Sequence, residues 1–189
     1  MSVWWSGVDP GGRWTGLALL NAQHRYVTGL CITRVTEAPT RLGVGNDYLD
    51  AVCEGIAALQ AHAVAIDPGA SVMVALEDVD RPNPHLGITD PADIIRAGFV
   101  YGAVLRDYPG AVIVDLGENG SALQVAYPPP LRKHRSPGAE QGGFTSEERP
   151  HLRSALDVAR RGPASERIQI AAAFPRQSVP IPPKGKTRR

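Results

Sequence analysis

Apolar positions in the first 35 residues follow the short-period pattern that is typical of strands. Residues 3–9 form a compact apolar run that ends in an aspartate, and a Pro-Gly-Gly turn follows it. Two further apolar runs cover residues 15–21 and 26–35, and the second is rich in β-branched side chains, which favour strands. Because short turns separate the three runs, the sequence predicts three consecutive antiparallel strands.

Three later segments have the period of amphipathic helices. Apolar residues recur at helical spacing over residues 46–61, and Asn46 is the expected N-cap. The dipeptide Asp90-Pro91 is a cap-then-proline signature, and it predicts a helix over 91–107. A third helix is predicted over 150–161, where a Gly-Pro pair ends it.

Two apolar runs without alternation, residues 72–77 and 111–115, lie between these helices and are expected to be buried strands. The order βββαβαβα predicts an α/β fold, a mixed sheet with helices on both faces. We expect one domain over residues 1–174, with a long mobile loop at 118–149, and a disordered, basic, proline-rich tail at 175–189.

The composition is that of a globular protein. The chain has 189 residues, of which 43% are hydrophobic and 21% charged, so wholesale disorder is excluded. No apolar run approaches the length of a membrane span, and the N-terminus lacks a signal-peptide layout, so neither is expected. Cys31 and Cys53 lie in apolar patterns and are interpreted as buried thiols, which indicates a reducing compartment, the cytoplasm.

The near-neutral net charge hides an asymmetry. Residues 1–120 hold 7 Lys/Arg and 14 Asp/Glu, whereas residues 121–189 hold 13 Lys/Arg and 5 Asp/Glu. A basic arm that contacts phosphates and a solvated tail explain this split equally well.

Two carboxylates, Asp9 and Glu77, end apolar runs. A carboxylate at the end of a buried strand is costly unless it is solvated, paired or bound to a metal. A single case is usually an ordinary polar strand end. Two adjacent strand ends would instead bring like charges together, and a divalent cation would neutralise them. Oxygen ligands suit Mg²⁺, with Mn²⁺ as the alternative.

Three segments carry further information: GVDPGGRWTGLALL, VMVALED and HLRSALDVA. The first resembles the opening motif of the RuvC-type Holliday junction resolvases. The second is similar to the strand that ends in their second catalytic residue, here Glu77, and the third to their C-terminal helix with its last catalytic aspartate, here Asp157. The sequence of the third segment is most similar to RuvC-like proteins of actinobacteria and their phages. The opening motif matches at Gly7, Val8, Asp9, Pro10, Gly11, Thr15, Gly16 and Ala18. Sugar-kinase and actin ATPases open on a related turn, but they repeat it over two domains, for which this chain is too short.

The resemblance implies an RNase H-like fold and a homodimeric, Mg²⁺-dependent endonuclease that nicks two strands of a four-way DNA junction symmetrically. Two ions are implied. Asp9 would bridge both, and Glu77 and Asp157 would each complete the coordination of one ion. The chain departs from the family at Ser154, where an acid or a histidine is usual. His151 is either a proton shuttle or a polar residue of the first helical turn. It lies about 120° and about 9 Å from Asp157 on an ideal helix, too far to share one metal easily.

Several interpretations stay open at this point. Asp157 has arginines at i−4 and i+4, so it is either a metal ligand or the centre of a surface ion pair. Arg132, Lys133 and Arg135 are expected to hold the DNA backbone without reading its sequence. Trp14 either packs or stacks on an unpaired base.

Other acids and two glycines are also left with alternatives. Asp78 and Asp80 are expected to be solvated loop residues, and Asp115 is a weak candidate ligand. Gly98 and Gly102 indicate close packing in helix 91–107, within the core or, less favoured, against a second copy. The functional alternatives are another RNase H-like nuclease that cuts RNA–DNA hybrids or flaps, and a non-catalytic nucleic-acid-binding module.

Overall fold

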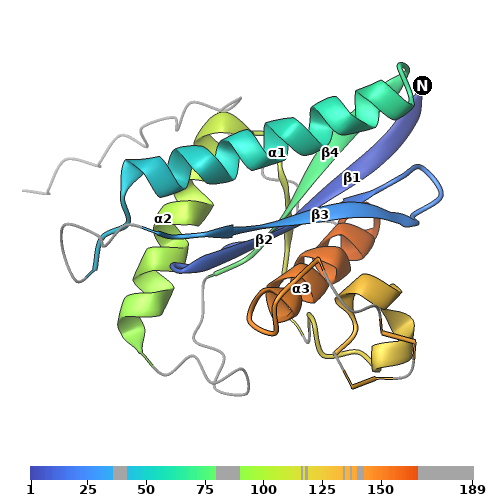
Figure 1. Cartoon of the computed structure of the whole chain (residues 1–189). Coiled ribbons are helices and arrows are strands. Elements are labelled where there is room, and N and C mark those ends of the chain that lie inside the picture. Colours follow the sequence, from blue (N-terminus) through green and yellow to red (C-terminus); the bar gives the residue numbers. More distant parts are fainter. Residues whose placement is uncertain are drawn as a thin grey trace, which may run out of the picture.

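A computed structural model describes residues 1–35, 42–79, 90–115, 117, 119–133, 135–136, 138–139 and 143–165. Asp80, the segment 167–174 and the tail 175–189 lie outside these residues. The main elements are the strands and helices of Figure 1: β1 (Ser2–Asp9), β2 (Trp14–Leu20), β3 (Tyr26–Thr33), α1 (Asn46–Ile66), β4 (Ala70–Glu77), α2 (Pro91–Asp107), β5 (Val112–Val114) and α3 (Glu148–Arg161).

The five strands form one mixed sheet in the order β3-β2-β1-β4-β5. β1, β2 and β3 are antiparallel neighbours, whereas β4 and β5 run parallel to β1 on its other side. The α/β, RNase H-like arrangement expected from the sequence is therefore confirmed. The cap at Asp90 is also confirmed, because its side chain accepts a hydrogen bond from the Ala92 amide. The expected cap at Asn46 is wrong, since Gly45 is the N-cap and Asn46 begins the helix.

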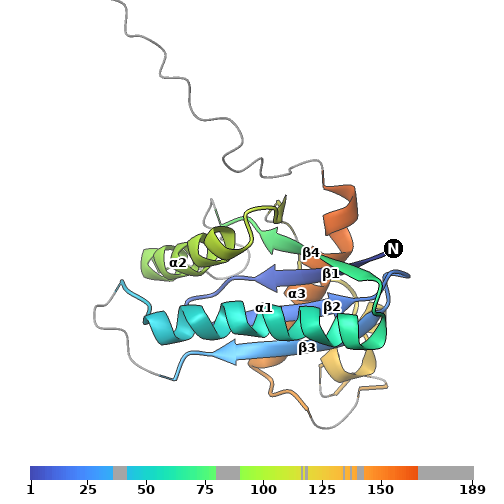
Figure 2. The ribbon, with the colours of Figure 1, turned by 90° about the horizontal axis from the view of Figure 1, so that it is seen from above.

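Helices cover both faces of the sheet, as Figure 1 shows, with α1 and α2 on one face and α3 on the other. Seen from above in Figure 2, α1 lies across the strands, and α2 lies toward the C-terminal ends of β1 and β4. Because side chains alternate along a strand, Trp4 packs in the α1–α2 layer and Trp5 in the α3 layer. Both indoles are therefore core residues.

Two glycines let α3 lie directly on the sheet. A Cβ at Gly7 would come within 2.0 Å of the Ala155 carbonyl oxygen, and one at Gly16 within 2.2 Å of the His151 carbonyl oxygen. No side chain fits between these backbones. Gly7 and Gly16, two of the three glycines of the opening motif, thus set the distance between α3 and the strands.

α1 is the one helix in the described part of the chain that is long and apolar enough, by length and composition, to cross a membrane. Core helices of globular proteins can have the same properties. Here the buried positions of α1 fall on one face, which packs on the sheet: Tyr48, Val52, Ile56, Leu59 and Ala63.

The segment expected as a mobile loop is partly ordered against α3. It contains two short 3-10 helices, Gln124–Ala126 and Pro129–Leu131, and the side chains of Tyr127 and Leu131 are fully buried in the α3 core layer. The preference for core packing at Gly98 and Gly102 is wrong, because no described atom lies within 4 Å of a Cβ built at either position.

Candidate active site

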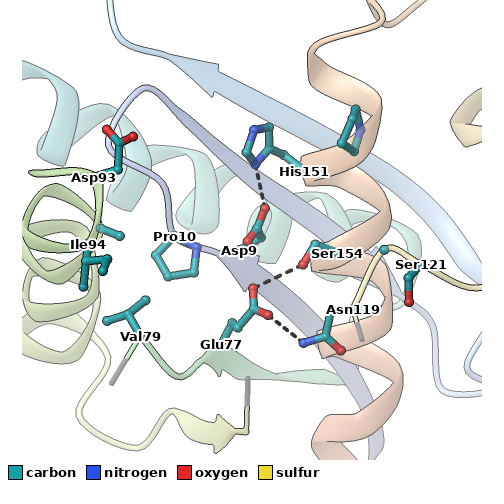
Figure 3. Close-up of a pocket in the computed structure, with 13 residues that line it drawn as sticks. Asp9, Pro10, Glu77, Val79, Asp93, Ile94, Asn119, Ser121, His151 and Ser154 are labelled. Carbon is teal, nitrogen blue, oxygen red and sulfur yellow. Dashed lines mark hydrogen bonds and ion pairs between the residues drawn. The ribbon is translucent and has the colours of Figure 1, made fainter. Parts of the chain in front are cut away.

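Asp9 and Glu77 end two neighbouring parallel strands at the same edge of the sheet. Val8 of β1 pairs with Leu76 of β4, so the two carboxylates follow at matching positions. Because alternate residues of a strand point to the same face, both side chains lie on the face of the sheet that α3 covers. They line a pocket of about 380 Å³, shown in Figure 3, whose walls come from β1, β4, α2, α3 and the segment after β5.

The turn after Asp9 is fixed by a buried hydroxyl pair. The hydroxyl groups of Thr15 and Tyr48 lie 2.8 Å apart, and the Tyr48 hydroxyl donates to the Gly11 carbonyl at 2.9 Å. The Gly11 and Thr15 positions of the sequence motif therefore hold the chain that leaves Asp9, which in turn orients the carboxylate.

Glu77 is the more buried of the two acids, with 4% of its surface exposed. Its carboxyl oxygens accept hydrogen bonds from the Asn119 amide at 2.7 Å and the Ser154 hydroxyl at 3.2 Å. Burial, the charge of Asp9 and a hydrogen bond with Asp9 raise the pKa of Glu77 to about 9, although the Asn119 and Ser154 bonds oppose the shift. Without a cation, Glu77 thus keeps its proton at neutral pH.

His151 joins this pair from α3. Its Nδ1 lies 2.8 Å from Asp9 Oδ2, the contact marked in Figure 3. Burial alone would lower the pKa of His151, but the hydrogen bond and the negative charge of Asp9 outweigh it, so the pKa is raised above its usual value. Asp9 therefore stabilises the protonated imidazole relative to an imidazole without this partner.

Trp14 packs against His151 and thereby holds its ring. The two rings stack with centroids 5.9 Å apart and planes inclined by 27°, and the Arg13 guanidinium lies 4.3 Å from the Trp14 centroid. Of the two interpretations of Trp14, the structure thus shows packing.

Asn119 is a site residue that the sequence interpretation missed. Arg161 Nη1 donates to Asn119 Oδ1 at 2.9 Å, which turns the amide nitrogen toward Glu77. A usable signal was present, because an Asn-Gly pair follows β5, and β5 is parallel to β4 and ends at the same sheet edge.

The structure does not bring Asp157 into this group. Its Oδ2 accepts hydrogen bonds from the Tyr127 hydroxyl at 2.6 Å and the Gly120 amide at 2.9 Å, and Arg160 Nη1 lies 3.3 Å from its Oδ1. Asp157 is absent from the pocket lining, whereas His151 and Ser154 face the pocket. The described contacts of Asp157 anchor the segment that carries Asn119.

We therefore expect Asp157→Asn to lower stability more than catalysis. Loss of the charged acceptor should cost about 1–2 kcal/mol of unfolding free energy, as estimated for hydrogen bonds to charged groups. The DNA cleavage that the sequence resemblance implies should stay within about tenfold of the wild type. Urea unfolding measures the loss of stability, and a cleavage assay measures the activity. Complete loss of cleavage in a folded variant would instead indicate that Asp157 is a metal ligand.

The donor set suits one divalent cation held together with substrate. Asp9 and Glu77 supply carboxylate oxygens, and Mg²⁺ is commonly bound by one or two carboxylates plus phosphate oxygens and waters. The described residues hold no cluster of three His, Cys, Asp or Glu side chains placed to bind one ion. Of the weaker candidates, neither Asp78 nor Asp115 is among the described pocket-lining residues.

The three basic side chains expected to contact the DNA backbone have different surroundings. Arg132 folds back onto its own segment, where its Nε donates to the Tyr127 carbonyl at 2.8 Å. Lys133 and Arg135 are exposed. Lys133 also lines a second cavity, which shares Pro150 with the pocket that Asp9 and Glu77 line.

Comparisons with known proteins return structures only. No protein-family model matches the chain, and no curated protein sequence matches it significantly. A RuvC structure from Thermus thermophilus in complex with a Holliday junction substrate shares 17% identity, with a TM-score of 0.48 over 83% of this chain and 90% of that chain. A second RuvC structure from Thermus thermophilus shares 16% identity, with a TM-score of 0.46 over 82% and 90% of the two chains. Both solved structures are thus of the type that the sequence motifs resemble.

Proposed function

We propose that the protein is a metal-dependent endonuclease of the RuvC type that cuts branched DNA, with the four-way junction as its substrate. The observation that carries the proposal is the Asp9–Glu77 pair, two carboxylates packed together at one edge of a sheet and open to a pocket. Such a pair is unfavourable without a cation. The motif around Asp9 and the basic second half of the chain support a phosphodiester substrate.

The side chains of the pocket have separate parts in the proposed reaction. A divalent cation held by Asp9 and Glu77, Mg²⁺ or Mn²⁺, would supply a water of lowered pKa and neutralise charge on the phosphate. Asn119 and Ser154 keep the Glu77 carboxylate in one orientation. His151 binds Asp9 through Nδ1, which leaves Nε2 as the atom that moves a proton, either from the attacking water or to the leaving oxygen.

A second copy of the chain is part of the proposal, because symmetric nicking of a junction needs two sites. α2 offers a suitable face. Ile95 and Phe99 are exposed there, and the open positions Gly98 and Gly102 lie beside them. Apolar side chains next to small residues permit close helix packing between subunits.

The decisive experiment compares substrates with purified protein. A labelled four-way junction, a linear duplex, a flap and an RNA–DNA hybrid are each incubated with Mg²⁺, Mn²⁺ or EDTA. We expect paired symmetric nicks in the junction alone, with none in EDTA.

The other outcomes point to the alternatives. Cutting of the hybrid or the flap in preference to the junction would indicate a different RNase H-like nuclease. Tight junction binding without cutting under either metal would indicate a non-catalytic binding module, and Ser154, which stands where the family has an acid or histidine, would be the first position to restore.

A further inference from the structure

We propose that the apolar side of the pocket of Asp9 and Glu77 binds a nucleobase that has left its stack next to the cleaved phosphate. Four side chains form this side of the pocket: Pro10, Val79, Ile94 and Ala97. We call them the apolar wall. The proposal rests on the proposed function, since the base belongs to the same DNA strand whose phosphate would lie at the two acids.

The pocket has two chemically different sides. Figure 3 shows Val79 and Ile94 on the side toward α2. Ser154 and His151 lie on the side toward α3. The proposed hydrolysis uses the acids and the α3 side, and it leaves the α2 side without a part. Phosphate oxygens are charged and gain nothing from apolar contact, so a different portion of the substrate is the better match for the apolar wall.

The carboxylate that α2 adds to this side does not change its character. The side chain of Asp93 is 57% exposed and bonds Arg96 at 2.9 Å, so it is mostly solvated. The wall residues are more enclosed, because Ala97 is buried and Val79 and Ile94 are partly buried. The pocket therefore presents apolar surface that a ligand can still cover, which is typical of sites for small, flat organic groups.

The apolar wall is in place before any ligand binds. α2 packs directly on the turn after Asp9, where a Cβ at Gly12 would come within 2.3 Å of the Arg96 Cβ. The Asp90 cap fixes the first turn of the same helix, and Pro10 is itself buried. Because the wall needs no rearrangement, binding of a base there loses little conformational entropy.

A nucleobase is the part of the substrate that fits this wall. It is joined through its sugar to a phosphate, so a phosphate at Asp9 brings a base close to the opposite side of the pocket. Every base has an apolar face, and contact through that face does not depend on the sequence. In a regular duplex the bases stay stacked and paired. Unpaired bases leave the stack at the lowest cost, so the apolar wall favours branched or distorted DNA.

The test changes the wall and the DNA together. Ile94→Ala removes much of the apolar surface and keeps the helix, since alanine is the best helix former. Ile66→Ala is the matched control, because Ile66 is 55% exposed and ends α1. The substrates are a four-way junction and the same junction without the base on either side of the mapped cleavage point. Single-turnover cleavage in Mg²⁺ gives the half-saturating protein concentration for each pair.

For the wild type we expect removal of one of these bases to raise the half-saturating concentration about fivefold, the loss of one apolar contact. Ile94→Ala should show the same rise with the intact junction and no further rise without the base. Ile94→Val should lie between them, and Ile66→Ala should match the wild type. If Ile94→Ala were as sensitive to base removal as the wild type, the apolar wall would not hold the base and the proposal would be overturned.

A second measurement separates the apolar wall from the proposed function. Protein with ¹³C-labelled isoleucine methyl groups is titrated with a short single-stranded oligonucleotide of deoxyadenosines, and with the same strand without bases. We expect the Ile94 methyl signals to shift with the first strand only, while those of Ile66 stay in place. If the protein cut no DNA, the proposed function would fail, and this titration alone would decide the wall: unmoved Ile94 signals would overturn it.

Discussion

We expect Asp9→Asn to abolish the proposed Mg²⁺-dependent cleavage of the junction while leaving DNA binding in place. The substitution removes the negative charge that Glu77 and His151 both contact, so we expect the site to lose cation binding and the charge that stabilises protonated His151. A loss of several kcal/mol of transition-state stabilisation corresponds to at least about a thousandfold in rate. The measurement is single-turnover cleavage, with anisotropy as the readout of binding.

Asp93→Asn is the matched control for that result. Asp93 is a carboxylate of the same pocket, but it lies on α2 and pairs with Arg96 at 2.9 Å. We expect this variant to cut within about threefold of the wild type, since an exposed ion pair contributes little. Equal activity of Asp9→Asn and wild type would remove the basis for the proposed chemistry.

The second large effect concerns the unfolding free energy of the metal-free protein. Glu77→Gln should raise the unfolding free energy of the metal-free protein, on the order of 2 kcal/mol at pH 8, because it removes a buried acid beside another acid. For a chain of this size that is a rise in Tm of roughly 4–8 °C. The same variant should lose the stabilisation that Mg²⁺ gives the wild type by mass action.

The sign of the pH dependence follows from the raised pKa. Folded Glu77 keeps its proton up to about pH 9, whereas the unfolded carboxyl releases it near 4.5, so the folded state binds more protons between these values. The stability of the wild type therefore falls as pH rises through this window, and the advantage of Glu77→Gln grows. Thermal melts from pH 5 to pH 9 check this. Glu54→Gln, on the exposed side of α1, should show no such trend.

Strand ends were the most predictable part of the site. Asp9 and Glu77 each follow an apolar run, and the period-2 rule together with a parallel pairing is enough to place them side by side. The site residues of α3 were harder to predict. α3 is buried on nearly every side, so its periodicity does not say which face meets the acids. The segment around Tyr127 covers the face that carries Asp157, and this leaves His151 and Ser154 for the pocket.

The loop after β5 was the least predictable part. Its prolines and glycines indicate irregular structure, and nothing local shows that Tyr127 and Leu131 are buried. Their segment is held by hydrogen bonds to two arginines and a carboxylate of α3, between 17 and 30 positions later in the chain. Contacts of this kind are tertiary, so Asn119 could be found only by reasoning about which strands end at the same edge.

Because α3 contacts Gly7 and Gly16 directly, the stability of the fold and the geometry of the acidic site depend on different layers of the molecule. Backbone atoms alone fix how far His151 and Ser154 stand from Asp9 and Glu77, whereas the large apolar side chains between the sheet and α1 lie on the opposite face. Apart from Tyr48, whose hydroxyl holds the turn after Asp9, apolar residues of that layer can therefore be substituted to change the unfolding free energy without altering the geometry of the acids. The α1 layer is accordingly the place to introduce heat tolerance into this chain while its chemistry is left as it is.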